Sequence, residues 1–226
     1  MSDLAQRYGA TVEAIRERAR QCSRDESDIR LIVVSKNHGP ELVRELHALG
    51  QRDFGENRDQ EAKPKAEQTA DLSDVNWHFV GQLQSNKVRS VLSYSRIIHS
   101  IDRASLVAAF EKELSLQNTL AGGFIQLNLT DDPGRGGVEP ANLLAFAELC
   151  QGVANLQVLG VMGVAALDRD PRIDFETIAK ASQALRGLIP GATAISAGMS
   201  EDFREAIDFG ATHLRIGSVI TGKRNL

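Results

Sequence analysis

Cysteine is scarce in this sequence, and it has neither long apolar runs nor an excess of positive charge. Its 226 residues include two cysteines, Cys22 and Cys150, whose separation matches no metal-binding spacing. We interpret both as reduced thiols of a cytoplasmic protein. No apolar run approaches the roughly 18 residues that a membrane span needs, and the N-terminal residues form a polar amphipathic pattern rather than a signal peptide. We therefore expect no membrane insertion.

An excess of basic residues is also missing. Lysine and arginine total 26 against 30 aspartates and glutamates, which gives a formal net charge of −4. Because no basic stripe is present, we expect no nucleic-acid partner. The chain also lacks a glycine-rich dinucleotide turn after its first predicted strand, which argues against a nucleotide-binding open sheet.

What the sequence does contain is an alternation of strand and helix patterns along its whole length. Strict alternation predicts parallel strands joined by right-handed crossovers, and eight such units close most economically into a (β/α)8 TIM barrel. A doubly wound open sheet is the alternative. We expect one domain over residues 1–226. The predicted strands lie at 29–37, 52–57, 75–81, 96–101, 122–129, 156–164, 192–197 and 212–217.

The two ends of the chain depart from a simple barrel. Apolar residues recur at steps of three and four from Leu4 to Cys22, which predicts an extra N-terminal helix with Asp3 as its N-cap. After Gly217 only the nine residues to Leu226 remain, too few for a full eighth helix. We hypothesise that the N-terminal helix covers the side that this truncated last helix leaves open.

The first predicted strand is apolar almost throughout and delivers Lys36 at its C-terminal end, with Pro40 near the start of the next helix. Because side chains alternate along a strand, an inward Lys36 implies that Val34 and Ile32 face inward too. The alternative is that the strand simply ends there and the lysine points into solvent.

Polar side chains are also expected inside the barrel. On the fifth strand Gln126 and Asn128 alternate with apolar residues, so the amides turn inward if the apolar face meets the helices. Arg215 on the eighth strand would join them and make the barrel mouth polar. The alternative is a polar core layer in which these groups satisfy one another.

The loops after the seventh and eighth strands carry the sharpest local signal. The first offers the hydroxyls of Ser196 and Ser200, a permissive Gly198 and a predicted helix start at Ser200. The second offers Gly217 and Ser218. Phosphate binds where helix-end N–H groups and hydroxyls converge, commonly after strands seven and eight of a barrel. We therefore predict a phosphate site, the alternative being an ordinary N-cap and an ordinary turn.

Two other patterns are interpreted without a ligand. The segment from Gly134 to Gly137 matches neither a P-loop nor a dinucleotide fingerprint, so we interpret it as a mobile loop. Three histidines on different predicted strands have no metal-type spacing, and we interpret them as core or pocket residues: His78, His99 and His213.

A lysine, a phosphate site and an arginine at one barrel mouth suit pyridoxal 5′-phosphate (PLP), which has an aldehyde, a phosphate and a ring nitrogen. Six motifs, in order along nearly the whole chain, resemble the pyridoxal phosphate homeostasis proteins. These proteins are similar to the N-terminal barrel of bacterial alanine racemase. The motifs are Val-Ser-Lys at 34–36, Phe-Gly-Glu-Asn at 54–57, Trp-His-Phe-Val-Gly at 77–81, Leu-Gln-Ser-Asn-Lys at 83–87, Gly-Met-Ser at 198–200 and Arg-Ile-Gly-Ser at 215–218.

The resemblance implies a role for each matching position. It implies that Lys36 is the Schiff-base lysine, that Arg215 meets the ring nitrogen, and that Asn57 lies in the pocket near the cofactor. Segments 37–39, 134–137 and 163–165 depart from the family pattern, which bears on the pocket rim more than on the cofactor. The resemblance assigns the phosphate to five residues: Ser196, Met199, Ser200, Gly217 and Ser218.

Three functions suit such a site: a non-catalytic PLP carrier, an amino-acid racemase, and a Schiff-base aldolase acting on sugar phosphates. The family motifs disfavour the aldolase. Alanine racemases take a second base from a tyrosine on a further domain, whereas here the sequence stops at Leu226 and its two tyrosines, Tyr8 and Tyr94, stand at no strand exit. Arg215 beside the ring nitrogen would also make the ring a weaker electron sink.

We therefore expect a PLP-binding protein of intracellular PLP homeostasis without substantial catalysis, with the racemase as the alternative. The expected partners are PLP and the PLP-dependent apoenzymes that receive it. We expect a cytoplasmic monomer, with a dimer as the second possibility.

Overall fold

A computed structural model describes residues 2–130 and 136–222. Within them the strands pair in chain order, all parallel, and the last pairs back onto the first, so the sheet closes into a barrel. The expected (β/α)8 TIM barrel is thus confirmed. The strands are β1 (Arg30–Val34), β2 (Asp53–Glu56), β3 (Asn76–Phe79), β4 (Ile97–Ile101), β5 (Ala121–Gln126), β6 (Leu156–Met162), β7 (Ala194–Ser196) and β8 (His213–Ile216).

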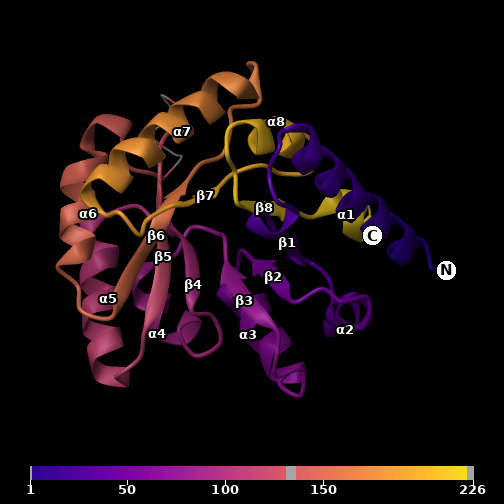
Figure 1. The fold of residues 1–226 in the computed structure, drawn as a ribbon. Helices are drawn as coiled ribbons and strands as arrows, with labels where there is room; N and C mark the ends of the chain where they lie inside the picture. The colour runs from indigo at the N-terminus through magenta and orange to yellow at the C-terminus, as the bar shows by residue number, and fades with distance from the viewer. Residues whose placement is uncertain (1, 131–135, 223–226) are drawn as a thin grey trace.

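Helices surround the barrel, as Figure 1 shows. Across the described residues, none of them combines the length and apolar character that a membrane crossing requires. The α-helices are α1 (Asp3–Gln21), α2 (Pro40–Ala48), α3 (Asp59–Gln68), α4 (Val88–Val91), α5 (Ala104–Gln117), α6 (Leu143–Gln151), α7 (Pro171–Leu188), α8 (Phe203–Asp208) and α9 (Ser218–Thr221). Short 3-10 helices lie at η1 (Glu26–Asp28), η2 (Ser85–Lys87) and η3 (Pro140–Asn142).

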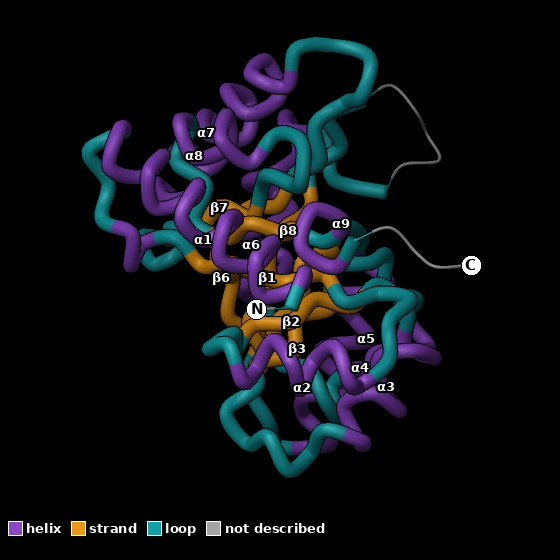
Figure 2. The backbone as a smooth tube through the Cα atoms, turned by 90° about the vertical axis from the view of Figure 1, so that its right-hand side faces the viewer, coloured by secondary structure: helices purple, strands orange, loops and turns teal. Residues whose placement is uncertain are grey.

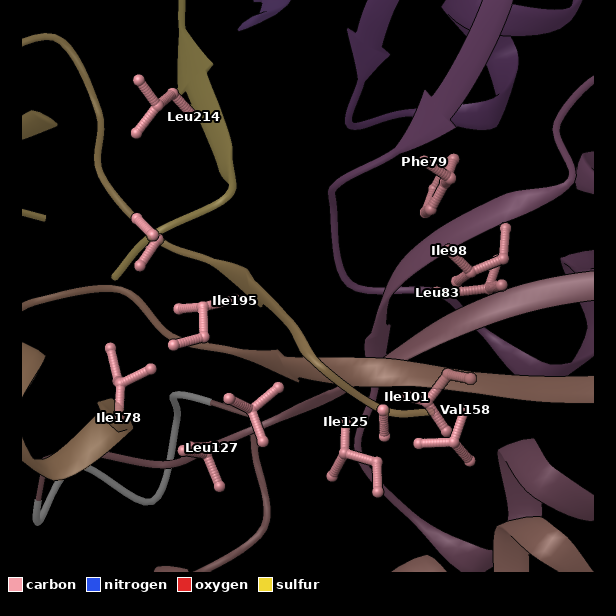
Figure 3. Packing of buried hydrophobic residues seen from close by; sticks show 14 of the residues in the cluster. Phe79, Leu83, Ile98, Ile101, Ile125, Leu127, Val158, Ile178, Ile195 and Leu214 are labelled. Carbon is pink, nitrogen blue, oxygen red and sulfur yellow. The ribbon is translucent and has the colours of Figure 1, made fainter. Parts of the chain in front are cut away.

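The main apolar core lies between the strands and the helices. Figure 3 shows Ile101, Ile125 and Val158, from three neighbouring strands, gathered in this layer, and all three are buried. Burying one such side chain contributes about 1.5–3 kcal/mol, which is why the outward face of each strand is apolar. Trp77 and Phe79 pack in the same layer, as the alternation along β3 predicts.

The N-terminal helix covers the side of the barrel that the short last helix leaves open. Figure 2 shows α1 beside α8 and α9, and α1 is in contact with both. Leu4 and Ile15 are buried on this face of α1, and the Arg7 guanidinium donates a hydrogen bond of 2.8 Å to the Ile220 carbonyl. The hypothesis drawn from the sequence is confirmed.

The cap of α1 differs from expectation. Ser2 is the N-cap, because its side chain accepts a hydrogen bond of 3.2 Å from the Ala5 N–H. Asp3 is instead the first helical residue. Its negative charge still stabilises the positive end of the helix dipole, so both residues favour a helix start here.

Candidate functional site

The exit of β1 places Lys36 at the C-terminal end of the barrel, where barrel proteins carry their functional residues. The strand ends at Val34, and Lys36 lies in the following turn with an exposed side chain. Among the described residues it has no ion-pair partner. Earlier on the same strand, Ile32 pairs in register with Arg215 of β8. Lys36 therefore follows the strand that pairs with the strand of Arg215.

The loops after β7 and β8 meet, as the sequence predicts. The hydroxyls of Ser200 and Ser218 lie 3.2 Å apart, and the Arg215 N–H donates to the Gly198 carbonyl at 2.9 Å. Gly198 has a φ of +90°, and a Cβ there would lie 2.7 Å from the Cβ of Ala206. The position therefore requires glycine, and the fold of this loop follows from it.

The helix after this loop begins later than predicted. Its first residue is Phe203 rather than Ser200, because residues 200–202 form a turn. In that turn the Asp202 carboxylate accepts a hydrogen bond of 2.6 Å from the Met199 N–H. A phosphate at this loop would therefore depend on hydroxyls and loop N–H groups more than on a helix dipole.

Arg215 is buried in the barrel, with 6% of its surface exposed. Its guanidinium donates to the Ser196 hydroxyl at 2.6 Å and to the Gly163 carbonyl at 2.9 Å, and it pairs with no carboxylate among the described residues. Burial lowers the pKa of Arg215 to about 10, so the group remains a cation at neutral pH. Ser196 is fully buried beneath the mouth, and its expected share in the phosphate site stays a prediction.

The three histidines lie inside the barrel, which confirms them as core or pocket residues. Phe124 stacks on His99 with ring centroids 4.4 Å apart and meets His213 edge-on at 5.1 Å. Burial lowers the pKa of His78, of His99 and, to about 3, of His213, so all three are neutral at neutral pH. The described residues contain no group of histidine, cysteine and carboxylate side chains able to hold a metal ion.

These neutral histidines predict that acid destabilises the fold. The unfolded chain binds their protons below a pKa of about 6.5 whereas the folded chain does not, so the free energy of unfolding falls as pH falls from about 6.5 towards 4.5. The slope contribution approaches about 1.4 kcal/mol per pH unit for each histidine. Urea unfolding at pH 7.5, 6.5 and 5.5 measures it. The variant His213→Gln should show a shallower slope, and an equal slope in both proteins would contradict the explanation.

The two amides predicted to share one face of the fifth strand lie at its end, because Gln126 is the last residue of β5 and Asn128 comes after it. Gln126 and Asn128 line a cavity of about 300 Å³ together with Val80, Gln82 and Met162. The Gln126 amide donates a hydrogen bond of 2.7 Å to the Gly136 carbonyl. Gly134 and Arg135 of the segment interpreted as a mobile loop lie outside the described residues, so that interpretation stays a prediction.

The side-chain oxygen of Asn57, in the loop after β2, is a hydrogen-bond acceptor without a donor among the described residues. This atom, Oδ1, is buried. Gly81 packs directly on the Asn57 backbone, where a Cβ would collide with the Asn57 carbonyl. Because buried polar atoms are nearly always paired, this orphaned oxygen points to a donor from a bound molecule.

The sequence did not predict a buried ion pair that lies beneath the loop after β1. The Lys65 ammonium, on α3, pairs with the Glu56 carboxylate and donates 2.8 Å to the carbonyl of Ser35, the residue before Lys36. The Ser35 hydroxyl donates 2.7 Å to the same carboxylate. Lys65 is 4% exposed and Glu56 fully buried. The pair thus fixes the backbone that carries Lys36, and nothing distinguishes Lys65 from the other polar residues of α3 in the sequence.

Comparisons with known proteins place the chain in a family. The family described as "Alanine racemase, N-terminal domain" matches residues 11–225. A pyridoxal phosphate homeostasis protein of Pseudomonas aeruginosa is 34% identical over 225 residues, which cover 100% of this chain and 97% of that relative. The chain belongs to the pyridoxal phosphate homeostasis protein family. The resemblance carried by the six motifs is thereby confirmed.

Solved structures agree with membership of the pyridoxal phosphate homeostasis protein family. PipY of Synechococcus elongatus PCC7942, whose structure has PLP bound, is 34% identical with a TM-score of 0.82, covering 92% of this chain and 100% of PipY. Alanine racemase of Corynebacterium glutamicum is 14% identical with a TM-score of 0.69, covering 95% of this chain and 62% of that one. The second likeness shows the barrel fold alone.

Proposed function

We propose that this protein binds PLP and holds it for intracellular PLP homeostasis, without substantial catalysis. The observation that carries the proposal is the 34% identity to PipY, whose structure has PLP bound. The residues at the mouth fit the cofactor, because they combine an exposed amine, two paired hydroxyls, a buried cation and an orphaned acceptor: Lys36, Ser200 with Ser218, Arg215, and Asn57.

PLP supplies an aldehyde that condenses with an amine to a Schiff base with loss of water, an anionic phosphate and a pyridine nitrogen. In the proposed complex Lys36 provides the amine. Ser200 and Ser218 hold the phosphate together with the backbone of Gly217. In this structure the Met199 N–H donates a hydrogen bond to the Asp202 carboxylate. It can bind the phosphate only after that hydrogen bond breaks.

The remaining two residues orient the ring. Arg215 donates to the pyridine nitrogen, and Asn57 accepts from a donor group of the cofactor. A guanidinium disfavours a proton on the ring nitrogen, which weakens the ring as an electron sink compared with a carboxylate partner. Among the described residues neither tyrosine stands at the mouth, since Tyr8 lies on α1 bonded to Gln51 and Tyr94 follows α4. Both features support retention of the cofactor rather than racemisation.

Absorption spectroscopy tests PLP binding. Purified protein titrated with PLP should develop a visible band, and borohydride should then fix the cofactor to the peptide that contains Lys36. The non-catalytic part is tested by incubating the loaded protein with L-alanine in deuterated water and following the α-proton by NMR. Exchange without racemisation is compatible with the proposal, whereas rapid formation of D-alanine contradicts it.

The phosphate site predicts a charge-dependent effect at Ser200. Ser200→Asp places a carboxylate beside the expected phosphate, and repulsion of about 1–4 kcal/mol at 4 Å, depending on the local dielectric, should weaken PLP binding at least about five-fold. Ser200→Asn is the matched control, because it has nearly the same size without the charge. Circular dichroism checks that both variants fold. Equal PLP affinity of the two variants would refute the assignment.

We also propose that the protein is a cytoplasmic monomer that passes PLP to PLP-dependent apoenzymes. The acidic net charge of −4 and the charged outer face of α3 support a chain that stays dispersed. Light scattering coupled to size exclusion measures the mass, and a stable dimer would overturn the monomer. Transfer is tested by mixing the loaded protein with an apoenzyme and following recovery of that enzyme's activity.

A further inference from the structure

Four buried polar side chains and the partly buried Asp53 form one continuous line of hydrogen bonds across the inside of the barrel. Arg215 Nη1 lies 2.6 Å from Ser196 Oγ, and Ser196 Oγ lies 2.8 Å from His99 Nδ1. His99 Nε2 lies 3.0 Å from His78 Nδ1, and His78 Nε2 lies 2.9 Å from Asp53 Oδ1. We call these residues the interior chain: Asp53, His78, His99, Ser196 and Arg215.

The interior chain spans the barrel from one end to the other. Its members come from β2, β3, β4, β7 and β8, so the bond between Ser196 and His99 crosses the inside of the barrel between strands that are not neighbours. Asp53 is the first residue of β2, at the N-terminal end, where the half-exposed Arg30 donates to it at 2.8 Å. Arg215 stands at the other end, beneath the mouth.

Chemistry fixes the direction of every bond in this line. Burial raises the pKa of Asp53, but hydrogen bonds from His78 and Arg30 outweigh it and leave the net pKa low, so the carboxylate only accepts. His78 must then donate from Nε2, and because a neutral imidazole donates from one nitrogen only, its Nδ1 accepts. The opposite tautomer would face the carboxylate with a lone pair.

The same logic continues to the arginine. His78 Nδ1 accepts, so His99 donates from Nε2 and its own Nδ1 accepts. The Ser196 hydroxyl then donates to His99, which leaves the Ser196 oxygen free to accept from the guanidinium. All four bonds run in one direction, from the cation to the carboxylate, and aligned bonds of this kind strengthen one another.

We infer that Asp53, His78, His99 and Ser196 are positioning residues for Arg215. They fix its guanidinium so that the N–H groups not used by Ser196 and Gly163 stay available to the ligand at the mouth. This inference rests on the proposed function for the identity of that ligand, the pyridine ring of PLP. The line itself belongs to the protein without ligand and can be tested there.

The first test measures tautomers in the protein without PLP. Long-range proton–nitrogen NMR on protein with ¹⁵N-labelled histidine distinguishes a protonated from an unprotonated ring nitrogen. Both His78 and His99 should be neutral and protonated on Nε2, with His78→Gln and His99→Gln assigning the signals. Protonation of either ring on Nδ1 overturns the inference, whether or not the protein binds PLP.

The second test uses Asp53→Asn, at the far end of the line. An amide can present either its oxygen or its NH2 group to His78 Nε2, so the Nε2 tautomer of His78 is no longer fixed. The population of the Nδ1 tautomer should rise at His78 and, through the shared hydrogen bond, at His99 as well. Asp74→Asn is the matched control, because Asp74 also pairs with an arginine, Arg52, but lies outside the interior chain. A tautomer change at His78 that is not accompanied by one at His99 overturns the inference.

The third test asks whether the line matters to the ligand. Ser196→Ala removes the acceptor of one guanidinium hydrogen bond, and PLP affinity should fall about ten-fold, as expected for losing a bond to a charged group. The absorption maximum of the bound cofactor should shift, while borohydride still fixes it to Lys36. Ser100→Ala is the control, since its hydroxyl is equally buried, on β4, but has no partner among the described residues.

The outcomes separate the two proposals. Loss of affinity and a spectral shift in Ser196→Ala, with neither in Ser100→Ala, support the positioning role. Equal behaviour of the two alanine variants overturns it. If the wild-type protein binds no PLP, the proposed function fails, while the tautomers in the free protein still decide whether the interior chain is ordered as inferred.

Discussion

Lys36→Ala is expected to abolish the visible band of bound PLP and all borohydride-stable attachment of the cofactor. Alanine has no amine, so no Schiff base can form at this position. Lys36 is the lysine at the exit of β1, where exposure and the absence of an ion pair with any described residue leave its amine accessible. PLP held only by the phosphate and ring contacts should remain in rapid exchange. The readout is the absorption spectrum together with peptide mapping after reduction.

Two controls make this result specific. Lys36→Arg keeps the positive charge but cannot condense with an aldehyde, so it too should lose the band. Lys63→Ala removes a lysine of α3 that forms no ion pair with a described residue, and it should behave as wild type. Mapping of the reduced cofactor to any lysine other than Lys36 would contradict the assignment.

Lys65→Met is expected to have the largest effect on stability. It leaves the Glu56 carboxylate buried without its cation, and breaking a buried pair in this way costs about 3–5 kcal/mol. The other oxygen of that carboxylate already lacks a partner among the described residues. Urea unfolding with linear extrapolation measures the change, at a pH where the wild type is stable.

The chain provides a matched control for this variant on the same helix. Lys63→Met makes the same substitution two positions earlier, at a residue without an ion pair in the described structure, and should change stability by no more than about 0.5 kcal/mol. The double variant Glu56→Gln with Lys65→Met should be more stable than Lys65→Met alone, because the uncompensated charge is gone. A Lys65→Met protein as stable as Lys63→Met would mean that the pair contributes little.

The architecture could be predicted from the sequence because it depends only on the hydrophobic periodicity of each segment and on the order of strand and helix segments along the chain. The apolar run before Lys36 and seven further runs, each followed by a helix signal, leave few topologies once parallel strands and right-handed crossovers are required. The role of α1 followed from the short segment after Gly217. Helix starts were less predictable, since the cap at Ser2 and the turn at Ser200 depend on which of several neighbouring side chains reaches a backbone N–H.

Residues of the candidate site could be predicted only where they lie at or near the C-terminal ends of strands. Lys36, Gly198 and Arg215 could be identified from their positions and from the motifs that contain them. The interior chain could not be predicted, because its histidines come from distant strands and their meeting depends on barrel closure and register. The pair of Glu56 and Lys65 was missed for a similar reason, since a lysine in a polar helix ordinarily faces solvent.

The place of α1 also has a consequence for how the protein is made. Helix α1 is synthesised before every strand of the barrel, whereas its partners α8 and α9 come after most of them. At roughly 5–20 residues per second, the ribosome needs on the order of ten seconds or more to reach them. During that time the face carrying Leu4 and Ile15 has no partner, and β1 lacks its neighbour β8. The seam between the first and last strands therefore closes only after synthesis, and until then the nascent chain presents an apolar helix face and an open sheet edge to chaperones.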